Sequence, residues 1–555
     1  MQDFKNATIL FEPDGYVVPG DKIMGRQAAG NSFLRSVVAH AGKNPLWCYT
    51  PSARSAQIFS QVVGDLNASV KTEWCPAHKP AGLRETGTLY LPGPNLDTYA
   101  NQRLRVGVDA YSLCGVTHTT ATHGAMDAIA NLLTTPVMPW DALICTSTAV
   151  RSTAETILQA QTEFLSWRFG SPINPTLPQL PVIPLGIQCE DFSFSADDHA
   201  AARAKLGIAD DEIVFLFVGR LSYHAKAHPH AMLLALEAVA RETGKRITLL
   251  QCGWFANAGI EATFREAPAK VCPNVRCLFT DGRDTDVRGA SWAASDVFIS
   301  LSDNYQETFG ITPIEAMAAG LPVIVSDWDG YKDTVPDGVT GFRIPTWSLA
   351  DDNVHGFAAR HEARFDTYDR YCGYTCQTVA VDQQALQARI TDLVENEALR
   401  KRMGAAGRAH AHATYDWNIV YKQYLTLWAE LADIRQKAGE TNLGSSTPRE
   451  AAGRMDPYKA FSSYPTAIVG PGTIVRLSAK DPVAAYRQNL GLSLFGYASS
   501  ILPNEKNAEL VFAALADGKA TSIADLTARM NARMEGLAFA LTVFAKMGLV
   551  SLSAK

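Results

Sequence analysis

Short apolar runs alternate with helical stretches through the first 430 residues, and this alternation constrains the fold more than any other feature. The clearest runs are IVFLFVGRL from Ile213, ITLLQCG from Ile247, DVFISLS from Asp296 and PVIVSD from Pro322. Strands that are apolar on both faces belong to parallel sheets whose two faces are covered by helices. The pattern therefore predicts an α/β fold.

The first half of the chain contains further strand-like runs. They are ATILFEP from Ala7, PLWCYT from Pro45, GTLYLPG from Gly87, ALICTS from Ala142 and LPVIPLG from Leu180. Two blocks of this kind predict two Rossmann-like domains, over residues 1–190 and 191–414, that face each other across a cleft. In such sheets ligands bind in the crevice at the carboxyl ends of the strands.

The chain after the second block divides into three parts. The aromatic-rich stretch Tyr415–Ile434 predicts a long amphipathic helix that returns to the first domain, at about 415–435. Residues 436–460 are rich in Gly, Ser, Thr, Pro and charge, which is typical of a linker. Residues 461–555 then predict a small accessory module, with three helical runs that end in a short hairpin.

The order of elements in this module is similar to a winged helix, a fold that often binds DNA. The third helical run, Met534–Met547, has only Glu535 and Lys546 as charged residues and no Arg, Asn or Gln. A recognition helix needs donors for base edges and phosphates. We therefore expect a core helix or a protein-docking helix, and no nucleic-acid partner. The module is a candidate surface for a protein partner or for self-association.

Composition excludes several other classes of protein. Apolar residues make up 47% of the 555 residues, which argues against intrinsic disorder. With 50 Lys and Arg against 56 Asp and Glu, the net charge of −6 gives no sign of a polyanion-binding surface. The stretch nearest to an apolar membrane span, Asn489–Asn504, is uncharged but short and contains several Gly and Ser residues, and the first residues lack a signal-peptide pattern. We expect a cytoplasmic protein, with at most peripheral contact at the inner membrane face.

The ten cysteines do not form a recognisable metal motif. Neither Cys272 and Cys277 nor Cys372 and Cys376 has a second ligand pair nearby, as a zinc site of this type would need. A few could pair as disulfides, but scattered buried thiols in a reducing compartment are the favoured interpretation.

The segment ETFGITPIE, from Glu307 to Glu315, is the most informative in the chain. It follows the predicted strand DVFISLS, and we expect a helix to begin near Thr312. The backbone N–H groups of Phe309, Gly310 and Ile311 would then face the crevice at a helix N-terminus, which favours a diphosphate. Gly310 would let the backbone approach that ligand closely.

The two glutamates also have simpler interpretations. Thr312 and Glu315 have the spacing of a capping box with Pro313 at the first helical position, so Glu315 could serve only as a cap. Glu307 precedes the helix, and its simpler interpretation is an exposed loop carboxylate.

Three motifs carry a resemblance to a known family. They are VFLFVGRLSYHAKAHP, AASDVFISLSDNYQETFGITPIEAMAAGLPVIVSDWDGYKDTV and GVTGFRIP, in this order and spacing. Together they resemble the retaining glycosyltransferases of family 4, which have the GT-B fold. The resemblance is strongest over residues 213–345, weaker in WDALICTSTAVRSTA, LPVIPLGIQCEDF and YDWNIVYKQYLTLW, and absent from residue 436 onward.

The resemblance assigns roles to four residues of the second domain. Glu307 matches the glutamate that contacts the donor sugar, and Glu315 matches the one that holds the ribose hydroxyls. Arg220 and Lys226 match the basic pair on the nucleotide diphosphate, although the spacing to Lys226 departs from the family's usual pattern. Fixed cations suit this role because negative charge grows on the diphosphate as the glycosidic bond breaks.

The resemblance also implicates residues of the first domain. His118 lies in a segment similar to the strand-end histidine segment that approaches the donor sugar, and a structural histidine is the alternative. His123 is a weaker candidate. Gly25 and Arg26, in MGRQAAGNSFLR, would contact the phosphates or the acceptor; ordinary helix-entry residues are the alternative.

The predicted function is the transfer of a sugar from a UDP- or GDP-sugar to a hydroxyl of a carbohydrate, lipid-linked or protein acceptor. Retention of anomeric configuration and independence of metal follow from the resemblance. The triplets Asp284–Asp286 and Asp327–Asp329 are not assigned a metal, since the first fits a helix N-cap and the second closes a strand. The alternatives are a GT-B-fold scaffold or binding protein that acts through its C-terminal module, and a GT-B-like nucleotide-sugar epimerase.

Overall fold

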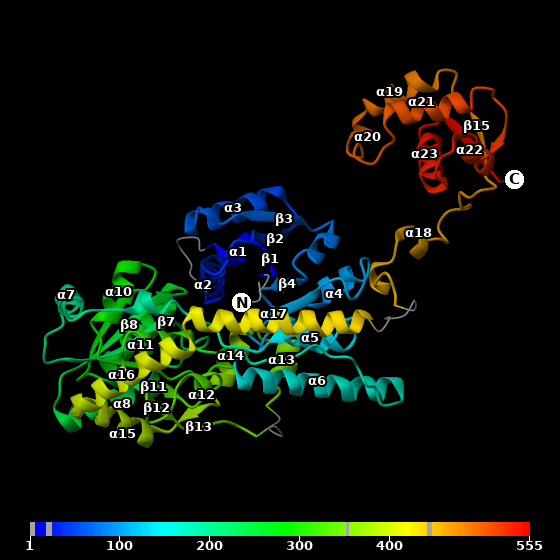
Figure 1. Cartoon of the computed structure of the whole chain (residues 1–555). Coiled ribbons are helices and arrows are strands. Elements are labelled where there is room, and N and C mark those ends of the chain that lie inside the picture. Colours follow the sequence, from blue (N-terminus) through cyan, green and yellow to red (C-terminus); the bar gives the residue numbers. More distant parts are fainter. Residues whose placement is uncertain (1–5, 18–24, 351–354, 441–446, 555) are drawn as a thin grey trace. The chain divides into compact units, whose positions relative to one another are not determined.

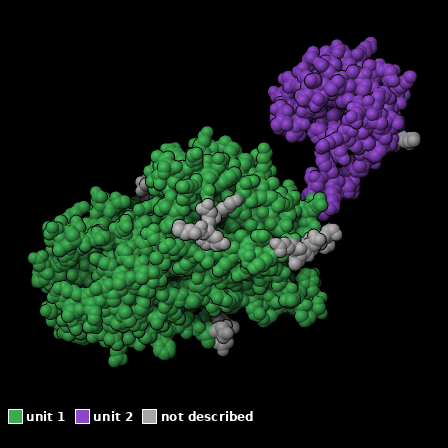
Figure 2. Space-filling model, in the orientation of Figure 1, with its two compact units in different colours: residues 1–451 green, residues 452–555 purple. Residues whose placement is uncertain are grey.

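The computed structural model describes residues 6–17, 25–350, 355–440 and 447–554. The chain divides into two compact units, residues 1–451 and 452–555 (Figure 2). The first unit contains two parallel six-stranded sheets covered by helices, and the second contains a small antiparallel sheet with helices (Figure 1). The α/β prediction with two Rossmann-like sheets and an additional helical region is confirmed.

The first sheet has the strand order β3-β2-β1-β4-β5-β6, and all its pairs are parallel. Its apolar strands are buried between two groups of core side chains, one on each face. The strands are β1 (Thr8–Leu10), β2 (Leu46–Thr50), β3 (Thr72–Pro76), β4 (Thr88–Leu91), β5 (Ser112–Val116) and β6 (Ala142–Ile144). The helices are α1 (Pro13–Tyr16), α2 (Gly25–Ala39), α3 (Ala53–Leu66), α4 (Asp97–Arg103), α5 (His123–Ala130) and α6 (Thr148–Phe169), with short 3₁₀ turns η1 (Pro80–Arg84) and η2 (Asn131–Leu133).

The second sheet has the order β12-β11-β10-β7-β8-β9 and is parallel throughout. Its strands are β7 (Ile213–Leu221), β8 (Ile247–Phe255), β9 (Arg276–Asp281), β10 (Val297–Ser300), β11 (Val323–Ser326) and β12 (Gly341–Ile344). Both sheets therefore run outward from a central strand pair, β1 and β4 in the first and β7 and β10 in the second. At such a pair the connections leave on opposite sides and open a ligand crevice.

Helices cover both faces of the second sheet (Figure 1). They are α7 (Ala196–Leu206), α8 (His230–Thr243), α9 (Ala258–Val271), α10 (Thr285–Ala293), α11 (Ile311–Ala318), α12 (Tyr331–Thr334), α15 (Gln383–Glu395) and α16 (Glu397–Thr414). A short antiparallel pair, β13 (Thr346–Trp347) and β14 (Ala380–Val381), flanks α13 (Phe357–Glu362) and α14 (Tyr368–Cys376). A 3₁₀ turn, η3 (Cys189–Phe192), precedes α7.

The long helix α17 (Trp417–Glu440) returns to the first sheet. Its buried face presents Trp417, Tyr421, Tyr424 and Trp428, which pack into the core that contains Phe33. The predicted return helix is therefore present. It continues to residue 440, so the prediction that a linker begins at 436 is wrong by one helical turn.

In the first half, one strand was predicted wrongly and one was not predicted. The run LPVIPLG at 180–186 forms only an isolated bridge, between Val182 and Cys145, because Pro181 and Pro184 lack the N–H groups that a strand ladder needs. Edge strand β3 was missed, since its sequence TEWCP is neither apolar nor alternating.

No described helix combines the length and the apolar character needed to cross a bilayer.

The second unit contains the short elements η4 (Ala452–Arg454) and α18 (Pro457–Ala460), followed by the module itself. The module consists of β15 (Ile474–Leu477), α19 (Pro482–Leu490), α20 (Ser493–Gly496), α21 (Glu505–Ala514), β16 (Thr521–Ser522), α22 (Ile523–Met530), α23 (Met534–Lys546) and β17 (Val550–Ser553). The predicted terminal hairpin is wrong, because the last strand, β17, pairs with β15, which is the first strand of the module in sequence. Helix α23 buries Leu537, Leu541 and Phe544 in the module's core, as expected of a core helix.

Candidate active site

Three candidate residues of the second domain lie at the carboxyl ends of β7 and β10 or in the loops that follow them. Arg220 is the penultimate residue of β7 and Lys226 lies in the loop after it, while Glu307 lies in the loop after β10. Because β7 and β10 are neighbours at the point where the strand order reverses, their loops border the same crevice. The fold thus brings residues that are far apart in sequence to one edge of the sheet.

Lys226 and Glu307 form an ion pair across this crevice. The Lys226 Nζ atom lies 2.5 Å from Glu307 Oε2, and the two side chains are 29% and 11% exposed. Burial by itself would raise the pKa of Glu307. The ammonium of Lys226 and the backbone amides of Thr308 and Phe309 outweigh that effect and hold the pKa below its ordinary value. Glu307 is therefore an ionised, anchored carboxylate and not an exposed loop residue.

Arg220 contributes a second cation at the crevice. Its Nη2 donates a hydrogen bond to the carbonyl of Ala225 at 3.0 Å, which holds the guanidinium against the loop that carries Lys226. Among the described residues no acidic side chain forms an ion pair with Arg220. A partly buried guanidinium with free donors is well suited to a phosphate oxygen.

Helix α11 begins at this crevice, and its first residues correct the predicted cap. The N-cap is Gly310, with φ of 86°, and the helix starts at Ile311, so Thr312 is its second residue and Glu315 its fifth. The capping-box interpretation is wrong, because Thr312 lies inside the helix. Gly310 is needed for a second reason as well: a Cβ there would lie 2.0 Å from a ring carbon of Tyr331.

Glu315 lies on the first turns of α11, near but not paired with the cations. Burial raises the pKa of its carboxyl to about 7, against the weaker pull of Arg288 and Lys226. Of the three amides predicted to face a diphosphate, that of Phe309 interacts with Glu307 instead. Those of Gly310 and Ile311 lie at the helix N-terminus, where a partial positive charge favours an anion.

Two acidic residues near the crevice were not singled out as site residues. Asp303 follows β10 and accepts a hydrogen bond from the His228 amide at 3.3 Å; burial raises its pKa to about 7. Asp329 follows β11 with φ of 46°, a left-handed conformation that is unusual for a residue other than glycine. Burial, and then the charge of Glu307, raise the pKa of Asp329 to about 8. Their position just after buried strands was the available signal.

The first domain meets Glu307 through its neighbour Thr308. The Thr308 hydroxyl donates to the carbonyl of His118 at 2.7 Å, and the Thr308 carbonyl accepts from the Ser147 hydroxyl at 2.7 Å. His118, which follows β5, is therefore brought beside the second domain's site. The ring of His123 also lies against a residue of the second domain, His361, with ring centroids 4.2 Å apart and an interplanar angle of 35°.

His118 also lines a cavity of about 450 Å³ in the first domain. The cavity lies at the carboxyl ends of β1, β4 and β5, where the first sheet reverses its strand order. Its lining combines aromatic and small residues with a few polar groups, among them Glu12, Gly15, Gly30, Tyr99, His118 and Thr122. A second hollow, of about 550 Å³, lies away from the site beside Trp47, Trp74 and His78.

Gly25 and Arg26 form the first turn of α2. The side chain of Arg26 lies outside the described residues. Farther along the same helix, Gly30 approaches the backbone of Gly15 so closely that a Cβ would lie 2.1 Å from the Gly15 carbonyl oxygen. Gly15 and Gly30 both line the cavity, so their close contact shapes its wall.

The first residue of each aspartate triplet makes a local contact. Asp284 is the N-cap of α10 and accepts hydrogen bonds from the amides of Asp286 and Val287, as expected. Asp327 lies 3.5 Å from Arg343.

Comparison with known proteins gives a family match for the second domain. Residues 198–355 match the family model described as glycosyl transferases group 1. The chain is 30% identical over 175 residues to a D-inositol 3-phosphate glycosyltransferase of Nocardia farcinica (strain IFM 10152), which covers 31% of this chain and 38% of that protein. It is 28% identical over 256 residues to a phosphatidyl-myo-inositol mannosyltransferase of Mycobacterium leprae (strain TN), covering 46% and 54%.

Solved structures are similar at a lower level. Anabaena Alr3699/HepE in complex with UDP is 16% identical, covers 76% of this chain and all of that chain, and gives a TM-score of 0.47. Sucrose-phosphate synthase (tll1590) from Thermosynechococcus elongatus is 16% identical, with coverages of 79% and 99% and a TM-score of 0.45.

The chain spans only about 38% to 54% of the length of these two curated relatives. The family match covers the whole second sheet, from β7 to β12. The predicted resemblance to glycosyltransferases is therefore confirmed over residues 198–355, the segment that contains Arg220, Lys226, Glu307 and Glu315.

Proposed function

We propose that this chain is a glycosyltransferase that moves a sugar from a UDP- or GDP-sugar to a hydroxyl-bearing acceptor. The observation that carries the proposal is the ion pair of Lys226 and Glu307, with Arg220 hydrogen-bonded to the loop that carries Lys226, at the reversal point of a sheet that matches a glycosyltransferase model. The cations can bind the diphosphate of a nucleotide sugar, and the oriented carboxylate can accept hydrogen bonds from its sugar.

In this proposal the second domain holds the donor. Arg220 and Lys226 contact the diphosphate, together with the amides at the start of α11, and Glu315 accepts hydrogen bonds from the ribose hydroxyls. Glu307, held in place by Lys226, accepts from hydroxyls of the donor sugar. As the bond between the sugar C1 and the diphosphate oxygen breaks, charge on the leaving group grows and the fixed cations bind it more strongly.

The acceptor in this proposal occupies the first-domain cavity, with His118 at the junction of the two sites. The acceptor hydroxyl oxygen forms a bond with C1 on the face that the diphosphate leaves, so the anomeric configuration is retained. Its proton passes to the departing phosphate oxygen, which balances the step without a separate base. The hydrogen bonds that join Thr308 to His118 and Ser147 would keep the two sites aligned.

Three finer points belong to the same proposal. Transfer needs no metal, because Arg220, Lys226 and the α11 N-terminus provide the positive charge. The acceptor is a carbohydrate, a lipid-linked molecule or a protein. The protein acts in the cytoplasm, with at most peripheral membrane contact. The domain assignment is a donor domain over about 191–414 and an acceptor domain over 1–190, completed by α17.

A panel of nucleotide sugars tests the proposal directly. A true donor should raise the unfolding midpoint, since a ligand that binds only the folded state stabilises it. Slow release of UDP or GDP in the absence of an acceptor should single out the same donor. Arg220→Ala should lose both responses. If no UDP- or GDP-sugar shifts the midpoint and none is hydrolysed, the proposal is wrong.

A further inference from the structure

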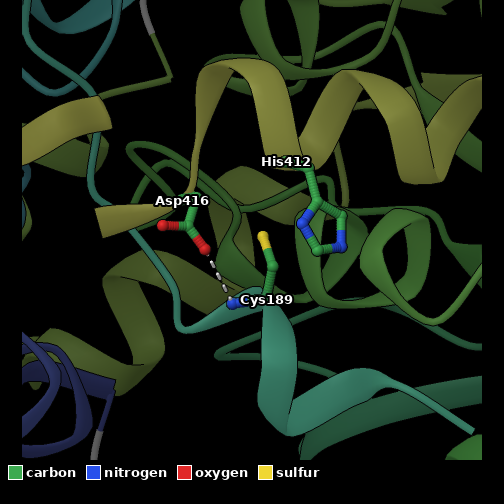
Figure 3. Close-up of side chains that lie close together, drawn as sticks. All are labelled: Cys189, His412 and Asp416. Carbon is green, nitrogen blue, oxygen red and sulfur yellow. Dashed lines mark hydrogen bonds between the residues drawn. The ribbon is translucent and has the colours of Figure 1, made fainter. Parts of the chain in front are cut away.

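Three side chains with metal-binding atoms meet at a place that the transfer reaction does not use. Cys189 lies in η3, His412 lies in α16, and Asp416 lies between α16 and α17. Figure 3 shows the thiol, the imidazole and one carboxylate oxygen turned toward one another. One atom from each residue lies within 4.8 Å of the other two, the sole such group of three among the residues that the structure describes.

This cluster lies where the chain passes between the two Rossmann-like sheets. The first connection leaves β6 and reaches β7 by way of Cys189, and the second leaves α16 and enters α17 at Asp416. The two connections pair with each other. The Ile187 amide donates to the Tyr415 carbonyl at 2.9 Å, and the Trp417 amide donates to the Ile187 carbonyl at 3.0 Å. Both connections between the two sheets therefore meet beside the cluster.

The three donors suit one class of metal ion. A thiolate, an imidazole and a carboxylate together favour zinc and related divalent transition metals, whereas calcium and magnesium prefer oxygen ligands alone. Asp416 is already oriented: one oxygen accepts from the amide and side chain of Asn418, at 2.8 and 2.7 Å, and the other accepts from the Cys189 amide at 3.3 Å. Such outer hydrogen bonds hold a ligand in the position that a metal requires.

The geometry requires only a small adjustment. Ligand atoms around a tetrahedral zinc lie about 3.5 Å apart, given bond lengths of about 2.0 to 2.3 Å. Cys189 and Asp416 are buried, but His412 is exposed, so its ring can turn toward the other two without disturbing the core. Its exposure also leaves one side of the cluster open to water.

We propose that Cys189, His412 and Asp416 bind a zinc ion, with water as the fourth ligand, and that this ion ties together the two connections between the domains. The site is separate from the residues assigned to the donor. Its role is to stiffen the hinge and thereby to limit opening and closing of the cleft.

The alternative to a metal site is a hydrogen bond between Cys189 and Asp416 alone. Burial, and then the charge of Asp416, raise the pKa of the Cys189 thiol to about 12, so without a metal the thiol stays protonated and hydrogen-bonds to Asp416. That contact does not involve His412. The two interpretations therefore differ in whether an exposed histidine on α16 matters.

Cobalt binding to the full-length protein distinguishes them. After dialysis against a chelator, the wild-type protein should bind one equivalent of Co²⁺ with a thiolate-to-cobalt charge-transfer band, and Zn²⁺ should displace it. Cys189→Ser should lose the band, and His412→Ala should bind at least tenfold more weakly. Cys277→Ser and His355→Ala are matched controls away from the cluster and should bind as the wild type does.

Zinc should also raise the unfolding midpoint of the wild type and of both controls, but not of the two cluster variants. His412→Ala keeps the test decisive even if Cys189→Ser fails to fold, since His412 is exposed. Absence of the band in the wild type, or an unchanged affinity for Co²⁺ in His412→Ala, would overturn the proposal. Neither readout depends on nucleotide-sugar binding. A negative result for the metal site would therefore leave the proposed transferase activity standing, and a negative result for the transferase would leave the metal site standing.

Discussion

The Lys226 ammonium lies 2.5 Å from the Glu307 carboxylate and joins the loop after β7 to the loop after β10. Lys226 is a principal cause of the lowered pKa of Glu307. In Lys226→Met we expect burial to dominate, so that the pKa of Glu307 rises above its ordinary value and the carboxyl is partly protonated at neutral pH. Turnover should then fall steeply and recover in part as the pH increases. A pH–rate profile with no rising limb would contradict this coupling.

Arg220→Ala and Glu307→Ala should each lower kcat by about 100-fold or more, the usual effect of removing one group that stabilises developing charge or orients the substrate. Neither side chain belongs to the hydrophobic cores, so circular dichroism should show that both variants remain folded. Release of nucleoside diphosphate in the presence of an acceptor measures the effect.

Arg246→Ala provides the control for this pair of variants. Arg246 precedes β8, at the opposite edge of the same sheet, where it pairs with Asp211. It should turn over normally. Normal turnover in Arg220→Ala or in Glu307→Ala would refute the site assignment.

Glu315 should make both stability and donor binding depend on pH. The pKa of its carboxyl is about 7 in the folded chain and 4.5 in an ordinary setting. The folded chain thus holds this proton more tightly than the unfolded chain, and the resulting stability is complete below pH 4.5 and is lost as the pH rises through 7. Glu315→Gln has no carboxyl to ionise, so its stability should not fall in this way as the pH rises.

At pH 8 we expect Glu315→Gln to be more stable than the wild type by about 1–2 kcal/mol, a figure reduced to allow for partial exposure of the side chain. The two should converge as the pH falls toward 5. Urea unfolding at several pH values measures the difference, and donor affinity at pH 8 should fall in the variant. A stability difference that is the same at pH 5 and pH 8 would argue against a raised pKa.

The sequence predicted the layout of the second domain more accurately than that of the first. The long apolar strands β7 and β8 and the segment from β10 to β11 leave little ambiguity, because a continuous apolar run has one suitable place in such a fold. In the first domain β1 and β6 have three residues each, and β3 is a polar edge strand. Short or half-exposed strands depend on their neighbours and give weak local patterns.

The sequence singled out the residues of the candidate site but did not show how they pair. Arg220, Lys226, Glu307 and Glu315 do lie around one crevice, yet nothing in the sequence shows that Lys226 reaches Glu307 from a strand loop 81 positions away. The cap of α11 was misassigned for a local reason. Thr312 and Glu315 have capping-box spacing, but the left-handed Gly310 ends the loop earlier and puts Thr312 inside the helix.

Asp329 combines a left-handed backbone with a buried carboxyl, and its replacement should separate the two effects. Asp329→Gly should relieve backbone strain, which stabilises the fold by about 1 kcal/mol or less. It also removes a carboxyl whose pKa is about 8, so the gain should grow as the pH rises from 6 to 9. Urea unfolding across this range measures it.

Arg364→Gly is the matched control for Asp329→Gly. Arg364 has φ of 59° at the end of α13 but carries no buried carboxyl. Its gain should therefore be constant over the same pH range. Equal pH dependence in the two variants would refute the assigned pKa shift.

Transfer should persist in excess EDTA, because the proposed donor site supplies its positive charge through Arg220, Lys226 and the start of α11. The rate should also be unchanged by added Mg²⁺ or Mn²⁺. Loss of turnover in the wild type and in Cys189→Ser alike would overturn metal independence. Loss in the wild type that Cys189→Ser does not share would place the effect at the cluster between the domains.

Removal of residues 452–555 should leave donor binding intact. The second unit has its own core, with Val475, Tyr486, Phe512 and Phe544 buried among its helices. The crevice residues Arg220, Lys226, Glu307 and Glu315 all belong to the first unit. The shortened chain should thus show the same shift of its unfolding midpoint with a nucleotide sugar as the full chain, and adding the second unit as a separate protein should not change it. Loss of the shift upon truncation, with restoration by the added unit, would instead make the module part of the donor site.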